Sequence, residues 1–295
     1  MVLRIEGLSK TYGNGTRALN DVSLTIPPGM FGLLGPNGAG KSTLMRILAT
    51  LQEADSGSAR LGDIDVLRDK DAVRRTLGYL PQEFGLYPKV TAEDLLDHFA
   101  ILKGITDGAE RKRIVDSLFE QTNLQAARGK NLGTYSGGMR QRFGIAVALL
   151  GNPRLIIVDE PTAGLDPAER VRFLNLLSEL GENSVVILST HIVDDVSDLC
   201  SRMAIIDRGE IRLEAEPAAA VDSVTGRIWM RAVDRTELAE FQRDFAVIST
   251  KLAGGRTLIR VYSETEPAAP DFVAVSATLE DVYFAALRQQ IGAVR

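Results

Sequence analysis

The chain has 295 residues, of which 45% are hydrophobic and 25% charged, and its formal net charge is −5. This apolar fraction is ample for a packed core and excludes wholesale disorder. The single cysteine, Cys200, excludes a disulfide scaffold and a multi-cysteine metal site, and indicates a buried, reduced thiol. The negative net charge argues against a nucleic-acid partner. No apolar run approaches the roughly 18 residues of a membrane helix, and no cleavable hydrophobic region opens the chain, so composition predicts a soluble cytoplasmic protein.

The first part of the chain alternates extended segments with turns before a strand, a loop and a helix follow. Residues 1–30 are expected to form strands separated by turns that contain Gly, Asn and Pro. A short apolar strand over residues 31–34 leads into a glycine-rich turn. The next helix is expected to bury one face, because its apolar residues recur at i, i+3, i+4 and i+7: Leu44, Ile47, Leu48 and Leu51.

Helical patterns dominate the segment after Gln82. Thr91 and Asp94 fit a capping box that opens a helix, whose inward face is expected to hold Leu95, Leu96, Phe99 and Leu102. Residues 110–127 and 137–150 also predict helices.

The pattern of apolar residues changes twice in the later part of the chain. Strand and helix patterns alternate from 154 to 206, which is typical of a parallel sheet covered by helices. Residues 214–220 are expected to form a connector. Beyond them the patterns predict a small α+β domain that ends in a helix capped by Thr278 and Asp281.

A phosphate-binding loop is predicted between the first buried strand and the helix after it. The segment matches the pattern G-x-x-x-x-G-K-[ST], in which glycines let the backbone wrap around phosphates and the helix N-terminus adds positive potential. Lys41 would reach the β- and γ-phosphates, and Ser42 could hold Mg²⁺. The alternative, a plain glycine-rich turn, is disfavoured by this context. The expected nucleotide-binding residues are Gly35, Pro36, Asn37, Gly38, Ala39, Gly40, Lys41, Ser42 and Thr43.

Two adjacent acids end the apolar segment 155–160. A buried strand can bring both carboxylates to the edge of a sheet, where Asp159 is the expected partner of Mg²⁺. Because successive strand side chains point to opposite sides, Glu160 is expected to face the γ-phosphate and polarise an attacking water. The alternative is an ordinary strand end with two solvated acids.

Several further motifs occur in a fixed order and identify a family. The segment YSGGMRQR, residues 135–142, resembles the signature motif of ABC ATPases and precedes the Asp–Glu strand as in that family. Other family motifs appear in order at Tyr12, Gln82, residues 163–167 and His191. The resemblance covers about residues 1–215. It implies an α/β phosphate-loop (RecA-like) ATPase core with an antiparallel β subdomain and a helical signature subdomain.

The resemblance also implies a domain plan and a role for each motif. The ATP cassette would span residues 1–217, with the helical subdomain at about 83–150, and a small accessory domain would span 218–295. Tyr12 would stack on adenine. The implied catalytic residues are Lys41, Gln82, Glu160 and His191, and the implied metal ligands are Ser42, Gln82 and Asp159.

ABC ATPases work as head-to-tail pairs, which implies that the signature segment acts on a partner's nucleotide. Ser136, Gly137 and Gly138 would close over ATP held by the phosphate loop of the other subunit. A serine and bare amides at a helix start form a second anion-binding terminus. The family usually has leucine where Tyr135 stands, so we expect altered packing there without altered phosphate contacts.

The segment after Gln82 suggests what the ATPase is attached to. Phe84, Leu86 and Tyr87 form an apolar patch, which suggests a docking surface for a membrane permease subunit; internal packing of these side chains is the alternative. The wording GLYPKVT and the ending LEDVY resemble exporter ATPases for drugs and polysaccharides.

The resemblance therefore implies an ATP-hydrolysing, Mg²⁺-dependent subunit that drives export. It would form a homodimer or pair with a second ATPase, and would bind a separate permease at the inner face of the cell membrane. Three alternatives stay open: an importer ATPase, a non-transport ABC protein acting on ribosomes or DNA, and a subunit that binds ATP without hydrolysing it. The LEDVY ending argues against an importer ATPase. The single cassette without coiled-coil insertions argues against a non-transport ABC protein, and the intact catalytic residues argue against a subunit that only binds ATP.

Overall fold

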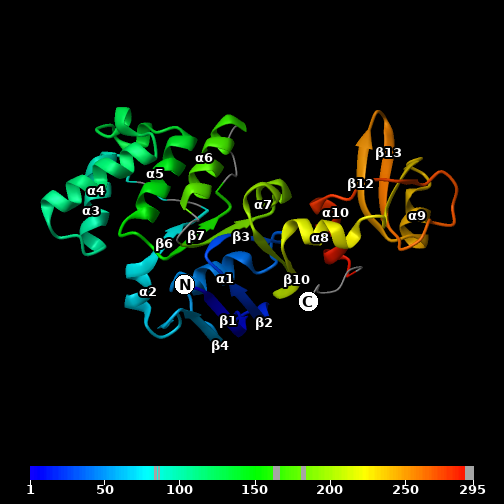
Figure 1. Cartoon of the computed structure of the whole chain (residues 1–295), viewed down its shortest axis with the longest axis horizontal. Coiled ribbons are helices and arrows are strands. Elements are labelled where there is room, and N and C mark those ends of the chain that lie inside the picture. Colours follow the sequence, from blue (N-terminus) through cyan, green and yellow to red (C-terminus); the bar gives the residue numbers. More distant parts are fainter. Residues whose placement is uncertain (83–84, 86, 162–166, 181–183, 290–295) are drawn as a thin grey trace.

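The structure is a computed structural model that describes residues 1–82, 85, 87–161, 167–180 and 184–289. Within these residues, three sheets and their helices form an elongated molecule (Figure 1). No helix in this part of the chain is long and apolar enough to cross a membrane. One sheet has the strand order β2-β1-β4-β5 and is antiparallel; its strands are β1 (Leu3–Thr11), β2 (Arg17–Ile26), β4 (Ser56–Leu61) and β5 (Ile64–Asp65).

The central sheet has the strand order β10-β9-β3-β8-β7-β6 and is parallel except for the hairpin β9–β10. Its register pairs Leu34 with Thr190 and Asp159 with Ser189. The loops that follow β3, β7 and β8 therefore meet at one edge of the sheet. The strands are β3 (Gly29–Leu34), β6 (Leu77–Leu80), β7 (Leu155–Asp159), β8 (Val185–Thr190), β9 (Arg202–Asp207) and β10 (Glu210–Ala215).

Helices cover this sheet and build a lobe at one end of the molecule (Figure 1). Helix α1 follows the phosphate loop, and α2 precedes β6. The lobe comprises α3, α4, two short 3₁₀ turns and α5, which share a buried cluster that includes Leu96, Phe119 and Phe143. The bounds are α1 (Lys41–Leu48), α2 (Lys70–Thr76), α3 (Ala92–Leu102), α4 (Gly108–Gln121), η1 (Gln125–Ala127), η2 (Leu132–Thr134), α5 (Gly137–Leu149), α6 (Pro167–Leu180) and α7 (Val193–Leu199).

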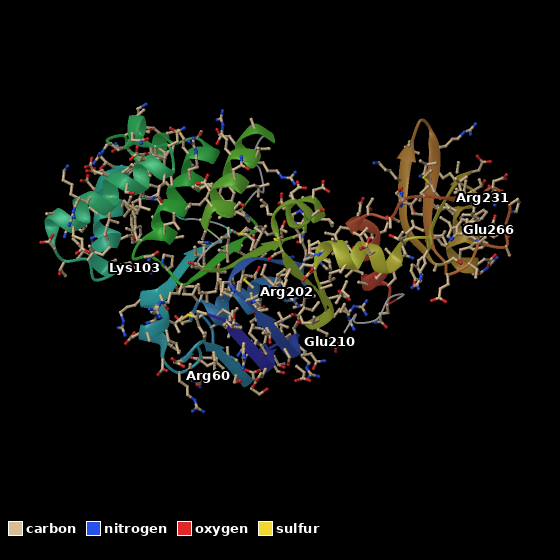
Figure 2. All side chains as sticks on the ribbon, in the orientation of Figure 1. Arg60, Lys103, Arg202, Glu210, Arg231 and Glu266 are labelled. Atoms are coloured by element: carbon tan, nitrogen blue, oxygen red, sulfur yellow. The ribbon has the colours of Figure 1, made fainter. Side chains whose placement is uncertain are left out.

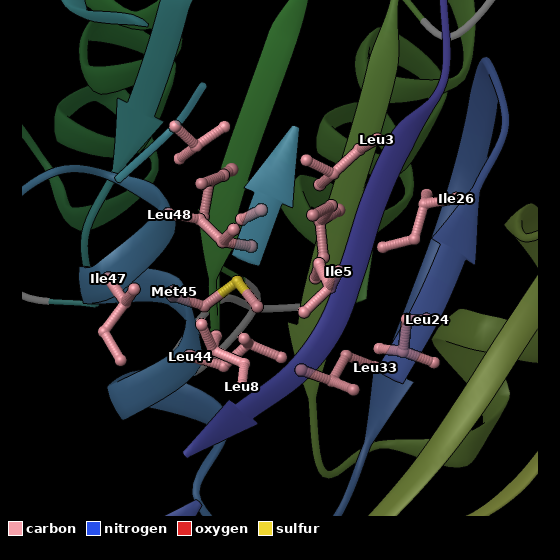
Figure 3. Packing of buried hydrophobic residues seen from close by; sticks show 14 of the residues in the cluster. Leu3, Ile5, Leu8, Leu24, Ile26, Leu33, Leu44, Met45, Ile47 and Leu48 are labelled. Carbon is pink, nitrogen blue, oxygen red and sulfur yellow. The ribbon is translucent and has the colours of Figure 1, made fainter. Parts of the chain in front are cut away.

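The main core lies between the antiparallel sheet and the central sheet. Figure 3 shows side chains of β1 facing side chains of α1, and Leu33 of β3 belongs to the same buried cluster. Leu3 and Ile5 are buried because they alternate along β1 with outward-facing residues. An irregularity in the register of β1 between Ile5 and Leu8 brings Leu8 to the same buried side. This packing fixes α1, and with it the phosphate loop, against the sheet.

The C-terminal region contains a third sheet, in the order β12-β13-β11-β14, at the end opposite the helical lobe (Figure 1). Phe241, Phe245 and Phe272 pack together against one face of this sheet. Helices α8 and α10 instead bury residues in the cluster that covers the central sheet. The elements are α8 (Pro217–Val224), β11 (Ile228–Val233), α9 (Leu238–Asp244), β12 (Val247–Ala253), β13 (Arg256–Tyr262), β14 (Val273–Ala274) and α10 (Leu279–Leu287).

An ion pair joins the third sheet to the last helix. Arg260 of β13 donates from Nε to Asp281 Oδ1 at 2.6 Å and from Nη2 to Oδ2 at 2.7 Å. Asp281 is buried and also completes the predicted capping box with Thr278. Because α10 packs on α7 and α8, this pair links the third sheet to the central sheet.

Three local predictions were wrong. Helix α1 ends at Leu48, so Leu51 lies outside the helix and is 64% exposed. Leu102 is the last residue of α3 and is 68% exposed; its side chain does not belong to the buried cluster of the lobe. The expected connector at 214–220 is partly helical: Pro217 occupies the first position of α8, where its missing N–H costs nothing, and the alanines after it favour helix.

Candidate functional site

The phosphate loop has the backbone that its glycines were expected to allow. Gly38 and Gly40 have φ angles of 79° and 110°, in the left-handed region that favours glycine. A Cβ atom at Gly40 would lie 2.5 Å from the carbonyl oxygen of Ala18. A Cβ atom at Gly35 would lie 2.4 Å from the carbonyl oxygen of Ile206. The loop therefore passes so close to two neighbouring strands that any larger residue would displace it.

Lys41 is buried at the first position of α1. Its Nζ donates to the carbonyl oxygens of Gly35, at 2.7 Å, and Pro36, at 3.2 Å. Burial lowers the pKa of Lys41, while the nearby carboxylates of Glu160 and Asp159 oppose that shift. The amine is thus held beside the loop by groups that a bound phosphate could replace.

A cavity of about 470 Å³ opens over the phosphate loop. It brings together the predicted residues Tyr12, Gln82 and Glu160 with the loop and α1. Three of its lining residues were not predicted, because a sequence pattern does not show that the turn between β1 and β2 returns to the loop: Thr16, Arg17 and Ala18. Ala18 lies beside the loop, since its carbonyl oxygen would be 2.5 Å from a Cβ atom at Gly40.

Glu160 is the point at which the predicted catalytic side chains meet. Gln82 Nε2 donates to Glu160 Oε2 at 3.0 Å. On the other carboxylate oxygen, Oε1, Lys41 Nζ lies at 3.6 Å and His191 Nδ1 at 3.4 Å. Four side chains that are far apart in sequence therefore lie within a single contact network beside the phosphate loop.

The backbone at Glu160 differs from the expectation. Strand β7 ends at Asp159, and Glu160 has a φ of 47°, a left-handed conformation that is uncommon for a residue with a side chain. Its N–H donates to the carbonyl oxygen of Ser189 on β8 at 2.8 Å. Because β7 ends at Asp159 and the chain turns at Glu160, strand alternation does not determine where the two carboxylates lie.

Asp159 fits a divalent cation. The residue is 3% exposed, and its Oδ1 atom has no hydrogen-bond partner in the described part of the chain. Ser42, at the second position of α1, adds a hydroxyl next to Lys41. Carboxylate and hydroxyl oxygens are donors that Mg²⁺ prefers, so these residues suit it.

Tyr12 lies at the rim of the cavity, with its ring partly exposed. Its Oη is 3.0 Å from Thr43 Oγ1 and 3.4 Å from Gln52 Oε1. The hydroxyl is therefore tied to α1 and to the turn after it.

The signature segment lies outside the cavity. Ser136 caps α5 and accepts from the N–H of Met139 at 3.2 Å. Ser136 and Gly137 are exposed and do not line the cavity. Tyr135 is buried in the helical lobe: its Oη donates to the carbonyl oxygen of Ala127 at 2.9 Å. The tyrosine therefore fills the lobe, while the serine and glycine next to it face solvent.

Several predicted positions cannot be compared with the structure. Phe84, Leu86 and residues 163–166 lie outside the described residues. Tyr87 is described and is 64% exposed.

A second, larger cavity of about 900 Å³ lies between α4 and the C-terminal end of α5. Lys103, labelled in Figure 2, lines it, but its amine donates to the carbonyl oxygens of Arg74 and Leu77. This cavity brings together none of the predicted catalytic residues, so the smaller one over the phosphate loop is the candidate site.

Known proteins share this organisation. The profile of the ABC transporter family matches residues 19–163. The chain is 34% identical over 282 residues to the daunorubicin/doxorubicin resistance ATP-binding protein DrrA of Streptomyces peucetius, covering 95% of this chain and 81% of that protein. It is 37% identical to the linearmycin resistance ATP-binding protein LnrL of Bacillus subtilis, covering 71% of this chain and 68% of that one.

Two further comparisons extend this result. The chain is 37% identical over 232 residues to the probable multidrug ABC transporter ATP-binding protein YbhF of Escherichia coli, and spans 40% of that protein's length. A dimeric ATP-binding cassette, solved in a post-hydrolysis state with ADP and Pi, superposes with a TM-score of 0.66 at 29% identity, covering 72% of this chain and 98% of that one. The phosphate loop, the site around Glu160 and these relatives together show that the chain belongs to the ATP-binding proteins of the ABC transporter family.

Proposed function

We propose that the protein is the ATP-hydrolysing subunit of an ABC exporter, with a site completed by a second ATPase subunit. The observation that carries this proposal is the meeting of Lys41, Gln82 and His191 at Glu160, beside a phosphate loop. An ATP-binding site without hydrolysis does not need a carboxylate and an imidazole within contact distance of each other at the end of β7 and β8.

Each side chain has a distinct part in the proposed reaction. The loop amides and Lys41 bind the β- and γ-phosphates. Asp159 and Ser42 would hold Mg²⁺, which neutralises phosphate charge when bound. Glu160 accepts a proton from the attacking water, Gln82 orients that water through its amide, and His191 donates to the γ-phosphate. Tyr12 stacks on the adenine at the rim of the cavity.

The signature segment supports a site shared between two chains. Ser136 and Gly137 are exposed at the start of α5, where a helix N-terminus and a hydroxyl favour an anion. Because they do not line the cavity of their own chain, we assign them, with Gly138, to the nucleotide of the partner subunit. The similar cassette that was solved with ADP and Pi is a dimer.

Export is supported by the relatives. Those reported above are named for resistance to doxorubicin or linearmycin, or as a probable multidrug transporter component. We assign the exposed Tyr87, with its neighbours Phe84 and Leu86, to the contact with a separate membrane permease at the cytoplasmic face. The cargo crosses through that permease, so the ATPase subunit does not contact it.

Phosphate release measured with and without Mg²⁺ tests this function. Lys41→Ala should lose ATP binding and Mg²⁺-dependent hydrolysis, because its buried amine lies against the loop carbonyl oxygens and beside Glu160. Lys112→Ala is the matched control, since that lysine is exposed and forms only a pair at i,i+4 on α4. Full hydrolysis by Lys41→Ala, or equal hydrolysis without Mg²⁺, would contradict the proposal.

A further inference from the structure

The helix that follows His191 is packed closely on several sides. Only Ile192 separates His191 from the first residue of α7, so the placement of α7 determines where the imidazole lies. On one side, a Cβ atom at Gly32 of β3 would lie 2.6 Å from a methyl carbon of Val196. On another, α10 packs against α7. Glycine in β3 thus allows an approach that any side chain would block.

A buried ion pair holds α7 from a third side. Asp195 lies in the first turn of α7 and is 0% exposed. Arg170 of α6 places Nε at 2.8 Å and Nη2 at 2.6 Å from Asp195 Oδ1. A buried carboxylate is costly unless it is paired, and the planar guanidinium constrains its partner's direction more than an ammonium does. The pair therefore fixes the orientation of α7 relative to α6.

The same helix, α6, also contacts the signature helix. Glu169, the neighbour of Arg170, has its Oε2 atom 3.6 Å from Nε of Arg142 on α5. A Cβ atom at Gly138 would lie 2.6 Å from Glu169 Oε2. Two consecutive residues of α6 therefore contact the helix that begins at the signature segment and the helix that follows His191.

We propose that the Arg170–Asp195 ion pair positions His191 for the γ-phosphate by holding α7 against α6. This inference rests on the proposed role of His191. Arg170 and Asp195 are positioning residues, because neither lines the cavity over the phosphate loop. Without the ion pair, α7 loses a contact at its first turn. The imidazole of His191, just before α7, would then no longer be held in one position.

Steady-state kinetics separate positioning from nucleotide binding. Arg170→Ala should lower kcat about 10- to 100-fold and leave the KM for ATP within about twofold, because the phosphate loop is untouched. Arg172→Ala, an exposed arginine on the same helix, is the matched control and should keep wild-type kinetics. If Arg170→Ala does not fold, Arg170→Lys is the second variant. It keeps the positive charge beside Asp195 but not the planar N–H donors of the guanidinium, and should lower kcat about tenfold.

A double-mutant cycle with His191→Ala shows whether the pair acts through the imidazole. In single-turnover experiments, adding Arg170→Ala to the His191→Ala variant should lower the hydrolysis rate by less than about twofold. The same substitution in the wild-type protein should lower that rate strongly. Equal losses in both backgrounds, or a raised KM with unchanged kcat, would overturn the inference while leaving the ATPase function intact. Wild-type turnover by His191→Ala alone would instead overturn the proposed role of His191.

Discussion

Glu160 combines an uncommon backbone conformation with contacts to three polar side chains. Its left-handed φ of 47° is compensated by the hydrogen bond from its N–H to Ser189 on β8. The turn directs the carboxylate toward Gln82 and His191, whereas Asp159 stays buried at the strand end. A left-handed residue at this position separates the carboxylate that we propose as proton acceptor from the one that we propose as metal ligand, although the two are adjacent in sequence.

Cys200 shows how burial controls a reactive group at the end of α7. Burial, with a smaller contribution from Asp195, raises the pKa of the Cys200 thiol to about 12. The native protein should therefore react very slowly with a thiol reagent at pH 8, whereas the unfolded chain, with a thiol pKa of about 8.5, should react fully. The absorbance of the chromophore that the reagent releases measures this reaction. Rapid labelling of the native protein would contradict the burial of the Cys200 thiol.

The same shift affects stability at alkaline pH. The folded chain keeps a proton that the unfolded chain releases above about pH 8.5. The stability contributed by this group is thus complete below that pH and is lost as the pH rises toward about 12.

At the scale of elements, close packing of α7 on β3 depends on one glycine. Gly32→Ala would place a Cβ atom 2.6 Å from Val196 and 3.2 Å from the sulfur of Cys200. The substitution should lower the free energy of unfolding by about 1–3 kcal/mol through overpacking, as measured by urea denaturation. Gly129→Ala is the control, because nothing lies within 4 Å of its Cβ position. Equal stability of the two variants would contradict the packing described for α7.

Much of this architecture could be predicted because it depends on local patterns. Buried apolar strands, the capping box at Thr278 and the phosphate loop each follow from residues close in sequence. A connector is expected from the sequence over 214–220, whereas α8 begins at Pro217, because proline is favoured at a first helical position. The approach of Ala18 to Gly40 and the pairing of Arg170 with Asp195 depend on the tertiary fold, so no spacing in the sequence reveals them.

At the scale of the whole molecule, the third sheet (β12-β13-β11-β14), called the accessory sheet below, is not an independent appendage. Figure 2 places Arg231 in that sheet, far from Lys103 in the helical lobe. Helices α8 and α10, which flank the sheet in sequence, nevertheless share a buried cluster with the central sheet. Through the Arg260–Asp281 pair, the last helix connects the accessory sheet to α7. The accessory sheet is therefore connected by packing and an ion pair to the helix that follows His191.

The proposed site shared between two chains would explain why the signature segment is exposed and lies outside the cavity. In this chain, Ser136 and Gly137 are exposed and do not line the cavity over the phosphate loop. ATP would bring them together by binding to the loop of one chain and the signature helix of the other. Hydrolysis would remove the γ-phosphate that both surfaces contact, and the pair would separate.

Hydrolysis at a site shared between two chains is tested most directly by the molar mass of Glu160→Gln, measured by light scattering with Mg²⁺–ATP. The amide keeps the shape of the side chain but cannot accept a proton, so hydrolysis should fall at least about 100-fold while ATP stays bound. The variant should have twice the chain mass of 32.0 kDa with ATP and the single-chain mass with ADP. Wild-type turnover by this variant, or a single-chain mass at saturating ATP, would contradict the proposal.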